Sequence, residues 1–539
     1  MRRVVPAWRL AFLFVRYAES VRYRLLYPVF FAAVYLSHLT LLRLPYFWDE
    51  AGYYIPAAWD FFRTGTLIPQ TTASNAHPPL PSILLAGWWH LSGFVPSGTR
   101  TFVCMTAAAA LLAVFGIGRK LLGTGAGAAL ALLTAVYPVW FAQSTLAHAD
   151  IFAAAFTLWG LLVYLGTVNG VQSSAPHWKV YAAVLFSLGV LSKETAIVTP
   201  AAIAGWEAIL LLRERKTKDA VGEHAEWIGA LLFPALPLAG WYAYHFHKTG
   251  FVFGNPQFLR YNVTGNFDLH RIALCLYHRL LHLTMHMNMF VPVVCTLAAL
   301  LLPAIDGRRR LSNRVTYAVL AVLAVNWVTF SVLGGALLTR YLLPMYPLVL
   351  LLCVAEWQRR FFRWEWIAVL SAAGFLAGIW INPPYAFAPE DNLTYRDMVV
   401  LHQRAVSLIT KKWPQATVLT AWPANAELTR PELGYTKSPV KAFTIKNFSL
   451  EEIQKAAADP GEYDTALVFS TKLTPRGPIN LGRRNEQQDT RYFDFHEDMR
   501  PRDIAAMLHG EVAWQDSRRG EWVAVLRFPR IVNAMNRLR

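Results

Sequence analysis

The sequence predicts a mainly α-helical, polytopic membrane protein with a small soluble α/β domain at its C-terminal end. Of its 539 residues, 55% are hydrophobic and only 16% are charged, whereas soluble domains contain about 25% charged residues. A helix of about 20 residues spans a hydrocarbon core of about 30 Å. Uncharged apolar runs of about this length recur up to residue 382. This composition excludes a soluble enzyme, a fibrous protein and a disordered chain.

The apolar runs predict about eleven membrane-spanning helices. They cover residues 25–42, 101–118, 126–147, 151–168, 179–193, 195–212, 227–245, 285–303, 315–338, 341–356 and 364–381. A further apolar stretch, residues 80–94, is shorter and contains Pro, Gly and Trp, so we expect it to lie along the membrane interface. With this assignment the Lys and Arg clusters fall in the loops on the inner side, as the positive-inside rule requires.

This topology divides the chain into three parts. Residues 1–24 form a basic amphipathic N-terminus inside the cell, and residues 25–382 form the membrane domain, with outer loops at 43–100 and 246–284. An odd number of spans places residues 383–539 outside, where strand-like segments at 417–422, 466–470 and 522–528 and helix-like segments at 449–458 and 501–509 predict the α/β domain. The net charge of +17 lies mostly in the short loops, so we expect no nucleic-acid partner.

Ionisable residues at the predicted outer ends of several spans indicate a functional site, because charge at a membrane boundary or inside a span is costly. They are Asp49 and Glu50 in YFWDEAGYY, His77 in NAHPPLP, His148 and Asp150 in STLAHAD, Lys193 and Glu194 in LSKETA, and Arg340 and Tyr341 in LLTRYLLPMYP. Taken singly, adjacent acids are typical of a solvated loop, and a lone Lys or Arg near a span end usually extends to the interface. Their convergence at one membrane depth favours a site.

The residue types in this group suit transfer of a group from a phosphate. A carboxylate can accept the proton of an attacking hydroxyl, and cations can stabilise the negative charge that develops on a leaving phosphate. Aromatic residues beside the acidic pair could line a carbohydrate site, although anchoring at the membrane interface explains them as well. These aromatic residues are Trp48, Tyr53, Tyr54 and Trp59.

The order of these motifs resembles the GT-C polyprenyl-phosphate-dependent glycosyltransferases. FWDE–A–YY, HPPL, an acid that opens a span, SKE and TRYLLPMYP follow one another over roughly residues 25–360. The pattern is most similar to the group of protein O-mannosyltransferases and lipid A aminoarabinose transferases. The resemblance implies a GT-C-like membrane fold in the bacterial inner membrane. It also implies transfer of a sugar from a polyprenyl-phosphate carrier, with inversion, to a lipid, glycan or protein acceptor on the outer face.

The resemblance also implies roles for individual residues. Asp49 matches the catalytic acid of the family and Glu50 its neighbour, and this pair could also hold a divalent metal, although no spacing requires one. Lys193, Arg340 and His77 would bind the donor phosphate, although aminoarabinose transferases have a lysine at the position of His77. The residues expected to orient the acceptor or the cations are Asp150, Glu194 and Tyr341.

Two other classes of function compete with a transferase. A transporter or flippase of a lipid-linked or anionic substrate would use the same cations, but should place them near the middle of the membrane, between broken helices. A membrane-anchored scaffold whose tail binds partners would leave the clustered charges unexplained. The long outer loops favour the enzyme.

Overall fold

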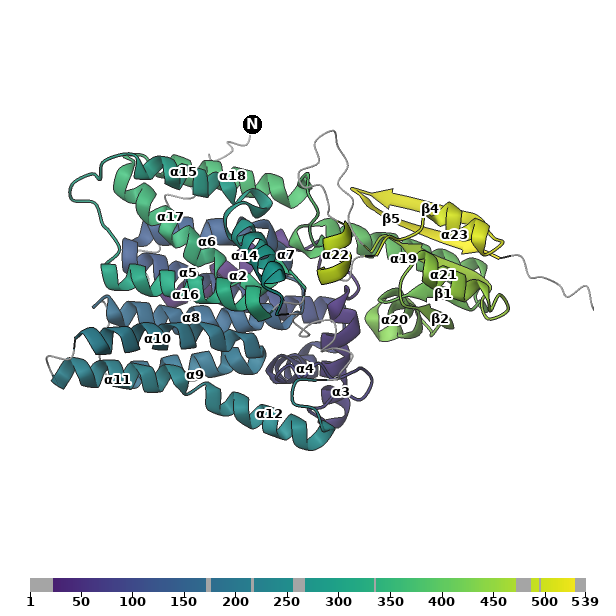
Figure 1. Ribbon diagram of the computed structural model, residues 1–539, viewed down its shortest axis with the longest axis horizontal. Coiled ribbons are helices and arrows are strands. Elements are labelled where there is room, and N and C mark those ends of the chain that lie inside the picture. Colours follow the sequence, from purple (N-terminus) through teal and green to yellow (C-terminus); the bar gives the residue numbers. More distant parts are fainter. Residues whose placement is uncertain are drawn as a thin grey trace, which may run out of the picture. The chain divides into compact units, whose positions relative to one another are not determined.

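The computed structural model describes residues 23–170, 176–214, 218–254, 267–333, 336–471, 486–493 and 496–528 (Figure 1). The chain forms two compact units. Unit 1 comprises Met1–Thr40 and Ala57–Ile381, and unit 2 comprises Leu41–Pro56 and Asn382–Arg539. The predicted amphipathic helix of residues 1–24 lies outside the described residues except for its last two positions, and so does part of the predicted loop 246–284.

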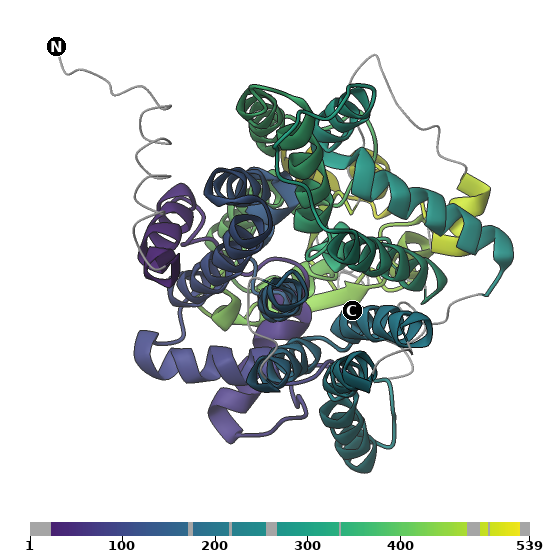
Figure 2. The same cartoon turned by 90° about the vertical axis from the view of Figure 1, so that its left-hand side faces the viewer.

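Unit 1 is built from helices, several of which have nearly parallel axes and are seen end-on in Figure 2. The helix α3 (Ile55–Thr64) begins in unit 2 and continues into unit 1. The other helices are α2 (Tyr27–Ser37), α4 (Leu80–Ser92), α5 (Pro96–Leu122), α6 (Thr124–Val136), α7 (Pro138–Gln143), α8 (Ala149–Val168), α9 (Pro176–Ser192), α10 (Val198–Arg213), α11 (Lys218–Leu232), α12 (Ala235–Thr249), α14 (Leu269–Thr284), α15 (Phe290–Leu300), α16 (Asn313–Leu333), α17 (Tyr346–Arg360) and α18 (Glu365–Trp380). The helix α5 packs against both α6 and α8, and α8 packs against α9. Most residues of α5 and α8 are buried.

The prediction of eleven membrane-spanning helices is wrong for the part of the chain that the structure describes. By length and apolar composition, four segments there are able to cross a membrane: α5, α8, the segment Glu194–Arg213 that contains α10, and α16. A fifth is obtained if Leu269–Asn288 and Phe290–Leu300, which are bent by 100° relative to each other, count as one span.

Proline and short helices explain part of the difference. Pro138 begins α7 and separates it from α6 within the predicted span 126–147, and Pro234 separates α11 from α12 within the predicted span 227–245. A proline in a helix interior removes a hydrogen bond and clashes with the preceding turn. The apolar helices α2, α6 and α18 are each shorter than 18 residues.

Unit 2 contains a five-stranded mixed sheet in the order β2–β1–β3–β5–β4. The strand β1 (Val418–Ala421) is parallel to β2 (Ala442–Ile445) and β3 (Thr465–Phe469), whereas β5 (Glu521–Arg527) is antiparallel to β3 and β4 (Glu511–Arg518). The unit also contains the helices α19 (Thr394–Lys412), α20 (Ala424–Thr429), α21 (Leu450–Ala457), α22 (Glu486–Phe493) and α23 (Pro501–Met507). The predicted strands correspond to β1, β3 and β5, and the predicted helices to α21 and α23.

A short segment from the beginning of the chain is part of unit 2. Tyr46 joins it to the C-terminal residues, because its N–H donates to the carbonyl of Leu433 and its own carbonyl accepts from the hydroxyl of Tyr435, both at 3.1 Å. The ring of Phe47 lies 5.7 Å from that of Tyr395. Asp49 and Glu50 follow directly in the chain and belong to unit 2.

Candidate active site

Three charged side chains from distant parts of unit 1 meet in a buried ion triad. Asp150 lies in the first turn of α8, Lys193 precedes the short helix η3 (Glu194–Ile197), and Arg340 lies in the short helix η5 (Thr339–Leu342). The Nζ of Lys193 donates to Oδ1 of Asp150 at 2.7 Å, and Nε of Arg340 lies 3.4 Å from Oδ2. Asp150 and Lys193 are each 4% exposed, and Arg340 is 2% exposed. Two cations therefore share one carboxylate out of contact with water.

The ring of Tyr341 covers this triad. Its centroid lies 4.1 Å from Nζ of Lys193 and 5.7 Å from the guanidinium carbons of both Arg340 and Arg279. The face of an aromatic ring attracts cations, more strongly when they are desolvated. Tyr341 is therefore placed to help hold the cations together.

Two further buried arginines lie in the same region of unit 1, Arg279 beside the ring of Tyr341 and Arg100 near His148. Arg279 on α14 donates to the carbonyls of Leu338 at 2.6 Å and Ala336 at 3.3 Å, and Arg100 on α5 donates to the carbonyl of Thr145 at 2.7 Å. Sequence analysis missed both, because Arg100 precedes the predicted span 101–118 and Arg279 lies in the predicted loop 246–284. For Arg279 a signal was present: the apolar residues of α14 recur at helical spacing, which indicates an amphipathic helix.

His148, next to the triad, is held as a neutral side chain. It is fully buried, and its Nδ1 lies 2.9 Å from Oε1 of Gln143. Burial, followed by the positive charges of the neighbouring Arg340, Lys193 and Arg100, lowers the pKa of His148 well below its usual range. A neutral His148 adds no further positive charge beside the cations.

A more exposed pair adjoins the triad. Nδ1 of His77 lies 2.8 Å from Oε2 of Glu194, and these side chains are 16% and 24% exposed. Glu194 follows Lys193 in the chain, so the pair is next to the buried cations. The structure thus joins His77 to the region of Lys193, while the role of these residues in one site stays a prediction.

Asp49 and Glu50 lie in unit 2. Glu50 begins a single π-helical turn, Glu50–Tyr54, and Asp49 directly precedes it. Glu50 is fully buried, and its Oε2 accepts the N–H of Phe47 at 2.8 Å, whereas Asp49 is half-buried. The rings of Trp48 and Tyr53 pack against Trp422, with centroids 4.9 and 6.2 Å apart. Trp422 lies in the C-terminal region, where the sequence shows no motif.

The described residues offer no ready metal site. Nowhere in the described ranges do three or more His, Cys, Asp or Glu residues come together as they would to hold a metal ion. A metal held by Asp49 and Glu50 therefore stays a prediction.

A family model described as dolichyl-phosphate-mannose-protein mannosyltransferase matches residues 76–241. Among solved structures, the chain is similar to ArnT from Cupriavidus metallidurans bound to undecaprenyl phosphate, with 13% identity, a TM-score of 0.52, and 92% of this chain and 97% of that chain covered. The same ArnT in the apo state matches with 13% identity, a TM-score of 0.54 and the same coverage. No curated protein matches the chain by sequence. The chain is similar to the GT-C glycosyltransferases.

The GT-C likeness confirms the resemblance inferred from the motifs and extends over most of the chain. The family model includes His77, Asp150, Lys193 and Glu194, but neither Asp49 nor Arg340. The triad can hold an anion chemically, because two buried cations on one carboxylate present more positive than negative charge. Such a preformed group of donors is suited to a phosphate.

Proposed function

We propose that this chain is a membrane glycosyltransferase that moves a sugar from a polyprenyl-phosphate carrier to an acceptor hydroxyl or phosphate. The transfer proceeds with inversion on the outer face of the bacterial inner membrane. The observation that carries the proposal is the pairing of Lys193 and Arg340 on the single carboxylate of Asp150 inside a helical unit. The GT-C likeness and the apolar helices support it.

Lys193 and Arg340 bind the donor phosphate in this proposal. As the bond between sugar and phosphate breaks, negative charge grows on the phosphate oxygens. Cations that are already in place stabilise that charge without reorganisation. Asp150 is a positioning residue, because each of its oxygens faces one of the two cations. This supports the orienting role expected for it from the sequence.

Asp49 is the general base for a hydroxyl acceptor. The acceptor oxygen attacks the anomeric carbon while Asp49 takes its proton, and the bond from that carbon to the phosphate oxygen breaks, with its electron pair leaving on the polyprenyl phosphate. The motif FWDE supports this role, as does the half-buried position of Asp49. Glu50 orients the turn, because its carboxylate accepts the N–H of Phe47.

His77, Glu194 and Tyr341 have supporting roles. His77 adds a donor toward the phosphate, and Glu194 fixes its ring through the 2.8 Å contact. Tyr341 keeps the ammonium of Lys193 over its face. The donor is a lipid-linked sugar, and the acceptor is a lipid, glycan or protein.

The test uses the full chain in liposomes that contain polyprenyl-phosphate sugars with a label on the sugar. We expect the label to move to an added membrane acceptor and free polyprenyl phosphate to accumulate in equal amount. Lys193→Met should abolish transfer, while Arg310→Gln, which removes an exposed arginine elsewhere in unit 1, should leave it unchanged. The test should use a panel of donors that differ in sugar and carrier length, each with lipid, glycan and protein acceptors. The proposal would be contradicted if no combination released polyprenyl phosphate.

A transporter or flippase is the second candidate, and one observation favours it. The segments Leu269–Asn288 and Phe290–Leu300 form an apolar pair bent by 100°, and broken helices line the substrate sites of many transporters. The same liposomes separate the two candidates. A flippase moves the intact labelled lipid between leaflets, whereas a transferase changes the covalent partner of the sugar.

A further inference from the structure

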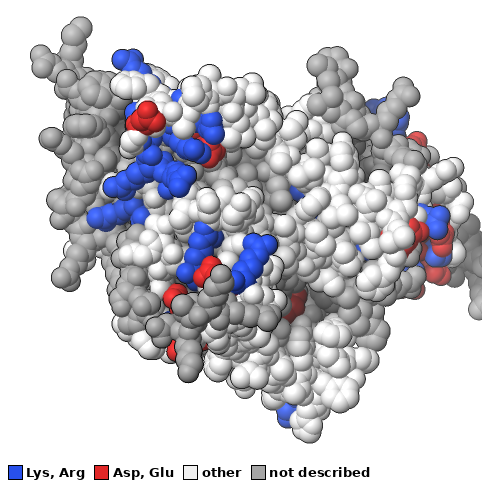
Figure 3. Space-filling view, turned by 60° about the vertical axis from the view of Figure 1, so that its left-hand side comes forward, with Lys and Arg blue, Asp and Glu red and all other residues white. Residues whose placement is uncertain are grey.

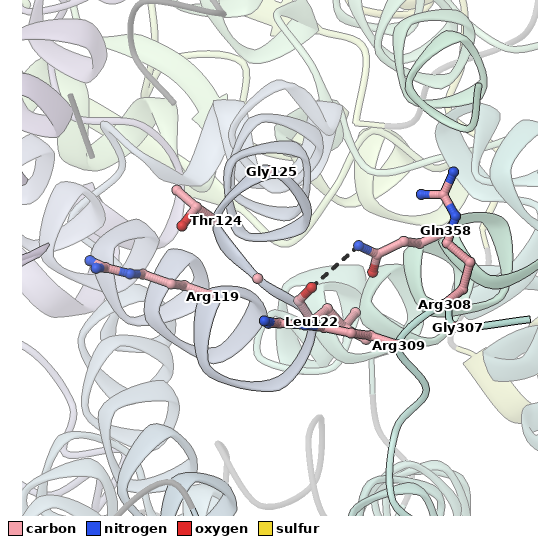
Figure 4. A pocket seen from close by; sticks show the side chains of 9 residues that line it. Arg119, Leu122, Thr124, Gly125, Gly307, Arg308, Arg309 and Gln358 are labelled. Atoms are coloured by element: carbon pink, nitrogen blue, oxygen red, sulfur yellow. Dashed lines mark hydrogen bonds between the residues drawn. The ribbon is translucent and has the colours of Figure 1, made fainter. Parts of the chain in front are cut away.

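A basic pocket lies at the other end of α5 from Arg100, and Figure 4 shows its lining. The pocket has a volume of about 450 Å³ and is lined by Arg119, Leu122, Gly123, Thr124, Gly125, Gly307, Arg308, Arg309 and Gln358. Arg100 and Arg119 are both on α5, and 19 helical residues rise by about 28 Å. That length is close to the thickness of a hydrocarbon core, about 30 Å. The pocket is therefore separated from the region of the ion triad by about one membrane thickness.

Close packing of α5 against α6 forms one wall of the pocket. A Cβ on Gly118 would lie 2.7 Å from Cα of Gly127, so this approach requires glycine. The turn between the two helices passes through Gly123, whose φ of +107° disfavours other residues. The guanidinium of Arg309 lies over this turn, because its Nη1 would be 3.2 Å from a Cβ on Gly123. The wall is thus built from backbone that has little freedom to move.

The opposite wall comes from α17 and the loop before α16. Nε2 of Gln358 donates to the carbonyl of Leu122 at 3.3 Å, the bond drawn in Figure 4, and ties α17 to the end of α5. The guanidinium of Arg308 lies 5.7 Å from the ring of Phe362. These contacts hold parts of the chain that are far apart in sequence around one cavity.

The pocket is strongly positive. Three of its nine described lining residues are arginine, and none of these nine is Asp or Glu. Figure 3 shows Lys and Arg gathered on the face formed by this end of the unit 1 helices. The N-terminus of α6, which begins at Thr124, adds the partial positive charge of a helix start.

We propose that this pocket binds the phosphate head group of an anionic membrane lipid. Guanidinium groups match phosphate oxygens in geometry as well as charge, and basic pockets between membrane helices are suited to such head groups. The pocket lies where α5, which is long and apolar enough to cross a membrane, reaches its end. A lipid held there has its acyl chains beside the apolar helices, which favours a lipid over free phosphate.

The test titrates the full chain in neutral detergent with dioleoyl phosphatidylglycerol and counts bound lipids by native mass spectrometry. We expect one site that binds more tightly than the rest. Arg309→Gln should weaken it roughly ten- to a hundredfold, as expected for the loss of a hydrogen bond between charged groups, and Arg119→Gln should do the same. Arg310→Gln is the matched control, because it removes the same charge from the same loop outside the lining, and it should change the affinity by less than about twofold.

Two further arms identify the ligand and control for folding. Inorganic phosphate, added at the lipid concentration that saturates the site, should not displace the lipid. The melting temperature of Arg309→Gln without lipid should equal that of the unsubstituted chain, because Arg309 is exposed. Equal weakening by Arg309→Gln and Arg310→Gln would overturn the proposal, since it would show only a general effect of charge. Displacement by phosphate at the concentration of the lipid would overturn it in favour of a site for free phosphate.

Discussion

The ammonium of Lys193 lies 2.7 Å from a carboxylate oxygen of Asp150, and both side chains are more than nine-tenths buried. The second oxygen of Asp150 faces Arg340 at 3.4 Å. A buried charge is tolerated when it is paired and hydrogen-bonded, so Asp150 stabilises two cations that would otherwise be costly to bury. The same arrangement keeps both cations fixed, as the proposed binding of the donor phosphate requires.

Asp150→Asn should therefore destabilise the chain strongly. Removing one member of a buried ion pair costs about 3–5 kcal/mol, because the asparagine leaves Lys193 and Arg340 without this negative charge. The measurement is the free energy of unfolding, or the melting temperature, of the full chain in detergent. Asp306→Asn, at an exposed acid of unit 1, is the control and should change stability by less than about 0.5 kcal/mol.

Combining Asp150→Asn with Lys193→Met tests the pairing itself. Residues in direct contact show non-additive effects. The loss of unfolding free energy in the double variant should therefore be smaller than the sum of the losses in the two single variants. Additive losses would show that the two side chains contribute independently and that the pair is not coupled.

Arg340 should control the affinity for the donor. Arg340→Ala should weaken binding of a labelled polyprenyl phosphate roughly ten- to a hundredfold, the range for a hydrogen bond between charged groups. Arg340→Lys should restore only part of the loss, because lysine keeps the charge without the planar fork of donors. Melting temperatures measured on the same samples separate binding from folding. Unchanged donor affinity in Arg340→Ala would assign Arg340 to the structural support of Asp150.

The C-terminal domain should lose stability as the pH rises toward neutrality. Glu521 lies at the start of β5, and its carboxylate accepts from the hydroxyl of Ser470. Burial raises the pKa of Glu521 from 4.5 to about 7, although the hydrogen bond from Ser470 and the charge of His402 oppose the shift. The folded domain thus holds this proton more tightly than the unfolded chain does.

The sign of the effect follows from that difference. Stability from Glu521 is fully present below about pH 4.5 and is lost as the pH rises to about 7, a loss of about 3 kcal/mol. Glu521→Gln should remove this dependence, because glutamine does not ionise. The measurement is hydrogen exchange of the β3 and β5 amides in the full chain between pH 4 and 8, corrected for intrinsic exchange rates. Identical pH profiles for both proteins would contradict the assignment.

Charged residues within apolar runs could be recognised from the sequence as candidate site residues. Lys193 and Arg340 stand out because apolar neighbours surround them, and the structure brings both onto Asp150. Arg279 did not stand out, because it lies among His and Tyr in a segment that was assigned to the outer loop 246–284, although its apolar residues recur at helical spacing. Its role follows from the carbonyls of Leu338 and Ala336, and contacts between such distant segments leave no local pattern.

The number of spans and the position of the acidic pair show a second limit of sequence reasoning. Hydropathy averages over a window and therefore passes over Pro138 and Pro234, which separate helices inside predicted spans. Residues 43–100 looked like one outer loop, yet the segment Leu41–Pro56 is part of unit 2. The hydrogen bonds of Tyr46 that attach this segment are made to the backbone of Leu433 and the side chain of Tyr435, which lie far away in the sequence.

The turn after Asp49 should be sensitive to a single methyl group. A Cβ on Gly52 would lie 2.8 Å from Nε1 and Cζ2 of Trp422, so Gly52→Ala forces the ring or the turn to move. Overpacking of this kind typically costs about 1–3 kcal/mol. Near-ultraviolet circular dichroism should report the altered packing of Trp422, and Trp422→Leu should relieve the stability loss when combined with Gly52→Ala. A fully native spectrum in Gly52→Ala would show that the contact is loose.

Asp49 is the residue on which the proposed proton transfer depends. A general base typically contributes a factor of about 10² to 10⁴ to the rate. Asp49→Asn keeps the shape of the side chain but accepts no proton, so turnover with a hydroxyl acceptor should fall within that range. Binding of the labelled donor should persist, because the proposal assigns the phosphate to Lys193 and Arg340.

Glu50→Gln and a chelator provide the controls for Asp49. If Glu50 only orients the turn through the N–H of Phe47, Glu50→Gln should reduce turnover less than Asp49→Asn does, and a chelator should not affect the unsubstituted protein. If the two acids share a metal, the chelator should abolish activity and both variants should be equally impaired. Near-normal turnover by a well-folded Asp49→Asn protein would reject Asp49 as the base. The proposal of a phosphate site at Lys193 and Arg340 would not be affected in that case, and Glu194, the more exposed acid beside it, would become the residue to test.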